Sequence, residues 1–198
     1  GILGGTFDPI HVGHLILAER AYYQFGLEEV LIMPSGNPPH KRNRINRASL
    51  EERIEMVRLA IEDNPHFILS LDDAHEMGYS YTRATLERLT AQNPDVEYYF
   101  IMGADSLFAF EEWKDPDQIA RLAVLVAAVR DHVSDQSMEL QIQHLMQKYG
   151  ADIRVLDVPN MDVSSHMLRD WIRENRSVRY YLSDPVISYI KNTGLYQD

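Results

Sequence analysis

The feature that most constrains the fold of this chain is its first 14 residues, GILGGTFDPIHVGH. The apolar residues from Gly1 to Leu3 are typical of the start of a buried strand. Gly4 and Gly5 follow directly, and without a Cβ atom they would form a turn and let a phosphate approach the backbone closely. From about Val12 the apolar residues have helical spacing, and the first amides of such a helix would point back at the glycine turn. This strand, turn and helix therefore predict an anion-binding site.

Two histidines, His11 and His14, lie three residues apart at the start of the expected helix. At that spacing their rings would face the same way, and both could donate a ring N–H group to phosphate oxygens. Taken separately, a Gly-Gly pair is more often a plain tight turn, and two histidines can bind a metal. A metal is the weaker interpretation because the chain has no cysteine and Asp8 lies on the far side of a proline turn.

The composition limits the remaining possibilities. With 198 residues the chain can bury a core as one domain, residues 1–198, without disulfide or metal staples. The absence of cysteine excludes a disulfide scaffold and a cysteine nucleophile, and it agrees with a reducing, cytoplasmic setting. A net charge of −11 argues against a general nucleic-acid surface, and no apolar stretch reaches the roughly 20 residues of a membrane helix. We expect a cytoplasmic protein with neither nucleic acid nor a membrane as partner; the sequence does not define its oligomeric state.

Segments with strand and helix patterns alternate along the rest of the chain. We expect strands at Glu29 to Met33, Phe67 to Leu71, Tyr98 to Met102, Leu122 to Val129 and Ile153 to Leu156, the fourth of them long and buried. We expect helices at Leu50 to Ile61, Thr82 to Gln92, Met138 to Tyr149, Ser165 to Asn175 and Asp184 to Ile190. Ser49 and Glu52 form a capping-box pair before the first of these helices.

Strands separated by helices imply right-handed crossovers, and therefore an α/β fold with a doubly wound parallel sheet and helices on both faces. Ligands in such folds bind at the carboxyl ends of the strands, which is where the first glycine turn would lie.

A polar loop from Ser35 to Asn46, together with the residue that follows it, concentrates positive charge in this acidic chain. The charged or histidine side chains are His40, Lys41, Arg42, Arg44 and Arg47. They would supply the local positive field that an anionic ligand needs, although composition alone fits a solvated surface loop equally well.

Two further stretches have the pattern of ligand sites. The expected strand at Tyr98 to Met102 ends at Gly103, and Asp105 follows two residues later, where a carboxylate could accept from both hydroxyls of a ribose. The alternative is that Asp105 or Ser106 caps a helix.

The second stretch, Val163 to Arg169, has Ser164 and Ser165 at the expected start of a helix and Arg169 one turn inside it. The serines, the free amides of that turn and the arginine would form a second anion site. Taken alone, a capped amphipathic helix explains the stretch better.

The segment from Gly4 to His14 resembles the HxGH signature of the nucleotidyltransferase α/β phosphodiesterase superfamily, and its longer form GGTFDPIHxGH is similar to that of the bacterial nicotinate-mononucleotide adenylyltransferases. Further segments resemble that family: PPHK at Pro38 to Lys41, SYT…T at Ser80 to Thr85, GADS…W at Gly103 to Trp113, VSSHMLR at Val163 to Arg169, and the terminal helix and GLY tail at Val186 to Tyr196. The VSSHMLR segment departs from the usual ISSTxIR, because His166 replaces the Thr and Leu168 the Ile.

The resemblance implies a Rossmann-like nucleotidyltransferase fold and an enzyme of NAD biosynthesis that transfers AMP from ATP to nicotinate mononucleotide, with Mg²⁺ on the pyrophosphate oxygens. It implies catalytic roles for His11, His14, Lys41 and Arg169; ATP binding by Gly4, Gly5, Thr6, Phe7, Gly103, Asp105, Ser164 and Ser165; and nicotinate mononucleotide binding by Thr85, Trp113 and Lys41. Arg42, Arg44 and Arg47 have no motif match, so we expect them to be solvated. Since the nucleotide would supply the ligands of Mg²⁺, no metal-binding cluster is expected in the protein.

Three alternatives share part of this pattern. A related transferase acting on nicotinamide mononucleotide, pantetheine phosphate or glycerol phosphate has both signatures, but the SYT…T and GADS…W elements oppose pantetheine and glycerol phosphate. A class I aminoacyl-tRNA synthetase shares the HxGH turn, yet nothing in the chain resembles a tRNA-binding module. A non-catalytic nucleotide sensor on the same fold would bind ATP without turnover.

Overall fold

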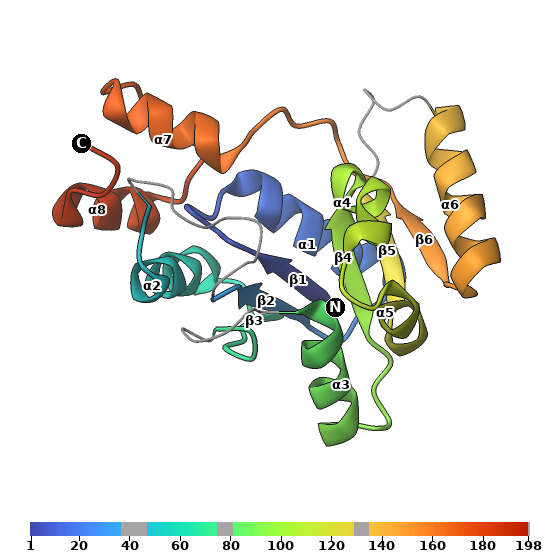
Figure 1. Cartoon of the computed structure of the whole chain (residues 1–198). Coiled ribbons are helices and arrows are strands. Elements are labelled where there is room, and N and C mark those ends of the chain that lie inside the picture. Colours follow the sequence, from blue (N-terminus) through green and yellow to red (C-terminus); the bar gives the residue numbers. More distant parts are fainter. Residues whose placement is uncertain (37–46, 75–80, 129–134, 198) are drawn as a thin grey trace. The chain divides into compact units, whose positions relative to one another are not determined.

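The structure is a computed structural model and describes residues 1–36, 47–74, 81–128 and 135–197 (Figure 1). Six strands in these residues form a parallel sheet in the order β3-β2-β1-β4-β5-β6. They are β1 (Ile2–Gly5), β2 (Val30–Pro34), β3 (Phe67–Leu69), β4 (Tyr99–Gly103), β5 (Val124–Ala128) and β6 (Ile153–Leu156). The first strand pairs with the fourth, Ile2 lying opposite Phe100 and Leu3 opposite Ile101. The predicted α/β fold with a parallel sheet is confirmed.

Helices connect and flank the strands. They are α1 (Val12–Phe25), α2 (Leu50–Ile61), α3 (Thr82–Gln92), α4 (Ala104–Phe108), the short 3₁₀ helix η2 (Phe110–Glu112), α5 (Pro116–Leu122), α6 (Asp135–Tyr149), α7 (Ser165–Arg173) and α8 (Asp184–Thr193). The predicted bounds of α3 and β6 are confirmed at both ends. The capping box before α2 is also confirmed, since Ser49 Oγ accepts from the N–H of Glu52 over 3.2 Å and the Glu52 carboxylate accepts from the N–H of Ser49 over 2.7 Å.

The prediction that Gly4 and Gly5 form the first turn is wrong. Both glycines are part of β1, and the chain leaves the sheet only after them. The change of direction falls on Phe7, whose φ of +49° lies in the left-handed region, and on the two residues that follow it. The reason is that parallel pairing continues along β1 and needs only extended backbone, which glycine can also adopt.

The expected long strand from Leu122 to Val129 is also wrong in its first part. Leu122 is the last residue of α5, and β5 begins at Val124. Helix α5 starts with Pro116 in its first turn, where proline is favoured because its missing N–H has no helical partner. No polar or turn-forming residue separates the apolar residues at the end of α5 from those of β5, so the sequence does not show where the helix ends and the strand begins. Val129 lies outside the described residues.

The chain divides into two compact units. The first comprises residues 1–3, 17–30 and 81–160. All of β5 is buried, as is most of β4, and α4 and α5 pack against these strands while α6 packs against both helices. Whether the whole chain is one domain, as the sequence suggests, stays a prediction.

The second unit comprises residues 4–16, 31–80 and 161–198 and contains the loop with the two histidines. Its helix α2 packs against β3 and α8. Helix α8 ends at Gly194, which has a φ of +72°, and the N–H of Leu195 then donates to the carbonyl of Ile190 over 3.2 Å. This glycine-dependent turn directs the last residues of the chain back toward the unit's core, where Tyr196 is buried.

In the described part of the chain, no helix combines the length and the apolar character needed to cross a membrane.

Candidate active site

The loop between β1 and α1 brings the two histidines of the motif together. The rings of His11 and His14 stack with centroids 3.7 Å apart and an interplanar angle of 29°, so the prediction that they face the same way is confirmed. The edge-on ring of Phe7 lies 5.0 Å from that of His14. The backbone N–H of His11 donates to Nδ1 of His14 over 3.2 Å. Because Nδ1 accepts this bond, neutral His14 carries its proton on Nε2, the nitrogen suited to donate to a ligand.

Two glycines leave room for the side chains of the motif itself. A Cβ atom on Gly13 would lie 2.9 Å from Cγ1 of Val163 and 3.1 Å from two atoms of the His11 ring. A Cβ atom on Gly5 would lie 2.8 Å from the ring of Phe7. Glycine is therefore needed at these two positions because a larger residue would clash with neighbouring side chains. The close approach of a phosphate, which the sequence suggested for Gly5, is a separate reason.

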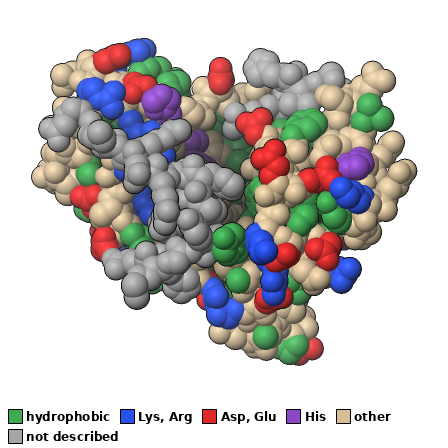
Figure 2. Space-filling view, viewed as in Figure 1, with side chains coloured by type: hydrophobic (Ala, Val, Ile, Leu, Met, Phe, Trp, Pro, Cys, Tyr) green, Lys and Arg blue, Asp and Glu red, His purple; other side chains and the backbone are tan. Residues whose placement is uncertain are grey.

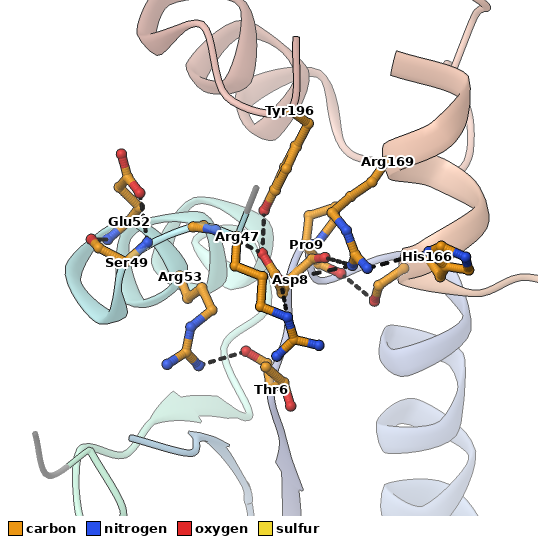
Figure 3. Close-up of polar contacts among 12 residues, drawn as sticks. Thr6, Asp8, Pro9, Arg47, Ser49, Glu52, Arg53, His166, Arg169 and Tyr196 are labelled. Atoms are coloured by element: carbon orange, nitrogen blue, oxygen red, sulfur yellow. Dashed lines mark hydrogen bonds and ion pairs between the residues drawn. The ribbon is translucent and has the colours of Figure 1, made fainter. Parts of the chain in front are cut away.

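A buried carboxylate, Asp8, lies at the centre of the polar contacts of this loop (Figure 3). It is only 2% exposed. Its Oδ1 accepts from the hydroxyl of Tyr196 over 2.7 Å and from the N–H of Ala48 over 3.2 Å. Its Oδ2 lies 3.7 Å from a guanidinium nitrogen of Arg47 and 3.7 Å from one of Arg169. Two hydrogen bonds and two opposite charges compensate for the burial of this carboxylate.

Arg53 on α2 is a second buried charge, and it joins the ends of two neighbouring strands. Its guanidinium donates to the carbonyl of Thr6 over 2.7 Å (Figure 3). It also donates to the carbonyl of Ser35 over 2.7 Å and to that of Gly36 over 3.1 Å. Burial lowers the pKa of Arg53, while the negative charge of Asp8 acts in the opposite direction. The guanidinium thereby supplies donors for carbonyls that have left the sheet at the ends of β1 and β2.

The N-terminus of α7 reaches the same loop. Ser164 is the N-cap, and its hydroxyl accepts from the N–H of Met167 over 3.2 Å, which confirms the predicted helix start. The hydroxyl of Ser165 donates to the carbonyl of Pro9 over 2.9 Å. One turn further, Arg169 donates to the carbonyl of Asp8 over 2.6 Å. Helix α7 is thus attached to the loop by two side chains that the sequence assigned to ligand binding.

His166, which departs from the family pattern, lies beside Arg169. Its Nδ1 is 3.4 Å from Nη2 of Arg169, and its Nε2 is 3.5 Å from a carboxylate oxygen of Asp170. The His166 side chain is 73% exposed. Figure 2 shows histidine, basic and acidic side chains close together on the surface over α7.

The basic loop is described only at its end. Lys41, His40, Arg42 and Arg44 lie outside the described residues, so their predicted roles stay predictions. Arg47 is described, and the expectation that it is solvated is wrong: its side chain is 19% exposed and faces Asp8. The buried carboxylate attracts this arginine because a charge removed from water needs a nearby opposite charge.

The remaining predicted site residues belong to the first unit. Gly103 is the N-cap of α4, Asp105 is exposed in the first turn of that helix, and no side chain caps it, so the alternative that Asp105 or Ser106 is the cap is wrong. Thr85 is buried on α3. Trp113 is half-buried and lies edge-on to Phe100, with ring centroids 5.9 Å apart.

No group of three or more histidine or carboxylate side chains in the described residues could hold a metal ion. The loop carries the ring nitrogens of the two histidines, and the guanidinium groups of Arg47 and Arg169 face Asp8, whose buried carboxylate is occupied by its partners. Such a site can bind phosphate oxygens, but it offers little to a divalent cation that the ligand does not itself bring.

Comparison with known proteins agrees with this arrangement. The cytidylyltransferase-like family model matches residues 2–171. A protein of Lachnoclostridium phytofermentans named "Probable nicotinate-nucleotide adenylyltransferase" is 47% identical, over 99% of this chain and 98% of that protein. One of the same name from Clostridium botulinum strain Alaska E43 is 39% identical, over 100% of this chain and 98% of that protein.

The fold also matches a solved structure. Plasmodium falciparum nicotinic acid mononucleotide adenylyltransferase complexed with NaAD superposes with a TM-score of 0.81, at 17% identity, over 98% of this chain and 95% of that one. The chain belongs to the cytidylyltransferase-like family and, within it, to the nicotinate-nucleotide adenylyltransferases, so the resemblance noted from the motifs is confirmed. It is therefore an enzyme, as predicted.

Sequence reasoning missed three residues that organise the loop. Asp8 was considered only as a metal ligand, and Tyr196 only as part of a tail motif. The sequence could have indicated a role for Arg53, because it falls on the apolar face of α2 between Leu50 and Val57. Burying a charge there costs free energy unless the charge has a partner.

Proposed function

We propose that this enzyme transfers AMP from ATP to nicotinate mononucleotide, giving nicotinate adenine dinucleotide and pyrophosphate, a step of NAD biosynthesis. Membership of the family supports the reaction. The structural observation that carries the proposal is the stacked pair His11 and His14, which follows Asp8 in the same loop. The Asp8 carboxylate faces the guanidinium groups of Arg47 and Arg169. In a chain with a net charge of −11, a local cluster of donors and positive charges is what a reaction between two polyanions needs.

The nucleophile needs no general base. The phosphate of nicotinate mononucleotide has a second pKa near 6 and is mostly dianionic at neutral pH. One of its oxygens forms a bond to the α-phosphorus of ATP, the bond from that phosphorus to the bridging oxygen breaks, and pyrophosphate leaves with the electron pair. Catalysis then consists of positioning the two substrates and stabilising charge on the transferring and leaving phosphates.

The residues of the second unit fit these tasks in the proposal. His11 and His14 donate to the α- and β-phosphates, His14 through Nε2, together with the backbone from Gly4 to Phe7. Arg169 and Lys41 supply flanking positive charge, and Ser164 and Ser165 provide the start of α7. The attachment of α7 to the β1–α1 loop through Ser165 and Arg169 supports this grouping.

In the first unit, Gly103 and Asp105 contact the adenosine ribose in the proposal, and Thr85 and Trp113 contact the nicotinate ring. The proposal includes Mg²⁺ as a cofactor, which would be held by the phosphate oxygens of ATP and would neutralise part of their charge. A cytoplasmic location is part of the proposal too. The half-buried position of Trp113 supports its contact with the nicotinate ring, since a stacking side chain must pack against the protein on one side and be accessible to the ligand on the other.

The experiment is a measurement of pyrophosphate release by the purified protein with ATP and Mg²⁺. Nicotinate mononucleotide, nicotinamide mononucleotide, pantetheine phosphate and glycerol phosphate are compared at the same concentrations. We expect the highest kcat/KM with nicotinate mononucleotide. A higher value with any of the other three substrates would replace the substrate assignment, and ATP binding without pyrophosphate release from any of the four would identify a nucleotide sensor.

A further inference from the structure

The segment after α8 contains a buried tyrosine, Tyr196, that the proposed mechanism does not use. Tyr196 is 5% exposed, and its hydroxyl donates to Oδ1 of Asp8 over 2.7 Å (Figure 3). The hydroxyl also lies 4.0 Å from the sulfur of Met56. The two residues of this hydrogen bond are 188 positions apart in the sequence. The bond therefore connects the end of the chain to the loop that leads into His11.

The backbone is held in an unfavourable conformation at both ends of this contact. Phe7, directly before Asp8, has a φ of +49°, and Tyr196 has a φ of +66°. Bulky side chains rarely adopt positive φ, and such residues persist only where the surrounding structure holds them. The buried rings of Phe7 and Tyr196 and the bond to Asp8 provide that restraint.

The Tyr196 hydroxyl also decides which way the Asp8 carboxylate faces. Oδ1 is engaged by Tyr196 and by the N–H of Ala48, so Oδ2 is left facing the guanidinium groups of Arg47 and Arg169. Without the hydroxyl, the carboxylate loses one of its two hydrogen bonds through Oδ1 and can rotate about its side-chain torsions.

We propose that Tyr196 is a positioning residue for the adenylyl transfer: its hydroxyl fixes the Asp8 carboxylate, and Asp8 holds Arg169 against the loop that leads into the histidine pair. This inference rests on the proposed function of the site. Tyr196 touches no substrate in this scheme and acts only through Asp8.

The test is the variant Tyr196→Phe, which keeps the ring and removes only the hydroxyl. We expect kcat per folded molecule to fall about tenfold, the size of one hydrogen bond to a charged group, with KM for both substrates within about twofold. We expect kcat to change and KM to stay the same because, in the proposal, Arg169 stabilises negative charge that grows only in the transition state. A purely structural role would lower the melting temperature and leave kcat per folded molecule unchanged.

Tyr180→Phe is the matched control. Tyr180 belongs to the same unit and also has a positive φ, of +70°, but it is 83% exposed. We expect this variant to keep both kcat and KM. An equal loss of kcat in the two variants would overturn the proposal, because it would show that the site responds to any tyrosine change in this part of the chain.

A double-mutant cycle separates action through Arg169 from an independent effect. The variant Arg169→Lys has already lost the guanidinium group that contacts Asp8. Adding Tyr196→Phe to it should therefore reduce kcat by less than about twofold further. A full tenfold loss in that background would overturn the proposal. If Tyr196→Phe does not fold, the variant Asp8→Asn tests the proposal instead. Asparagine keeps the size of the side chain and an acceptor oxygen but removes the charge. A folded Asp8→Asn with the wild-type kcat would overturn the proposal.

A crystal structure of Tyr196→Phe without substrates gives a readout that needs no activity. We expect a rotated Asp8 carboxylate and a longer distance from Arg169 to the Asp8 carbonyl, and an unchanged arrangement would contradict the inference. Wild-type protein without turnover on any substrate in the panel would instead refute the proposed function, so the two failures are distinguishable.

Discussion

Replacing Arg53 by leucine tests how strongly the buried guanidinium holds the loop of the site. The substitution removes the donors to the carbonyls of Thr6, Ser35 and Gly36 and keeps a side chain of good helix propensity on α2. These carbonyls lie where β1 and β2 leave the sheet. The variant therefore breaks the link between the two strand ends without disturbing the helix that carries it.

The expected loss follows from the hydrogen bonds. A hydrogen bond to a charged group contributes about 1.5 kcal/mol at the low end, so three such bonds contribute about 4–5 kcal/mol. Leucine regains about 1–2 kcal/mol, because it is an apolar side chain in a site that is 5% exposed. The net destabilisation is then about 3 kcal/mol, a large part of the 5–15 kcal/mol that typically holds a domain together.

Arg58→Leu on the same helix is the control. Its side chain is 46% exposed and pairs with Glu55 one turn away, an exposed ion pair that solvent screens and that contributes little to stability. Urea unfolding followed by far-UV circular dichroism gives both free energies. If Arg53→Leu unfolds within about 0.5 kcal/mol of Arg58→Leu, the guanidinium is not what stabilises the loop, and the reasoning is refuted.

Three further predictions concern the loop and its tyrosine. His14→Ala should lower turnover by roughly 10² to 10³, as the loss of one preorganised donor does; steady-state pyrophosphate release measures it, and a nearly unchanged rate would remove His14 from the mechanism. Gly13→Ala should be destabilised by about 1 kcal/mol in urea, because the clash of its Cβ with Val163 and His11 costs about 1–3 kcal/mol and alanine regains roughly 1 kcal/mol over glycine in a helix; a stabilised variant would contradict this. Burial, followed by the charge and hydrogen bond of Asp8, raises the pKa of Tyr196 above its ordinary 10.0, so its stabilising contribution is complete below pH 10 and is lost as the pH rises. Urea unfolding at pH 10 and 11 should show the wild type losing about 1 kcal/mol more than Tyr196→Phe over that interval, and parallel losses would show that Tyr196 ionises as easily in the folded protein as in the unfolded one.

Much of the local structure could be predicted because its causes are local. The capping box of Ser49 and Glu52 satisfies helix amides three residues away, and Ser164 caps α7 in the same manner. The histidine pair is placed by the spacing of the first helical turn. Errors came where two local signals competed: Gly4 and Gly5 are permissive in a turn and in a strand, and the strand pairing of β1 decided between them.

The sequence by itself determined the α/β order of elements, the caps of α2 and α7, the HxGH motif and, through its motifs, the family. Only the tertiary structure decided which polar groups are buried together. Asp8, Arg47, Arg169 and Tyr196 come from four separate segments of the chain, and each has an ordinary appearance in its own segment. The physical reason is that the free energy of a buried charge depends on all groups packed around it, whatever their distance in sequence, whereas a helix cap or a turn depends on neighbours a few residues away.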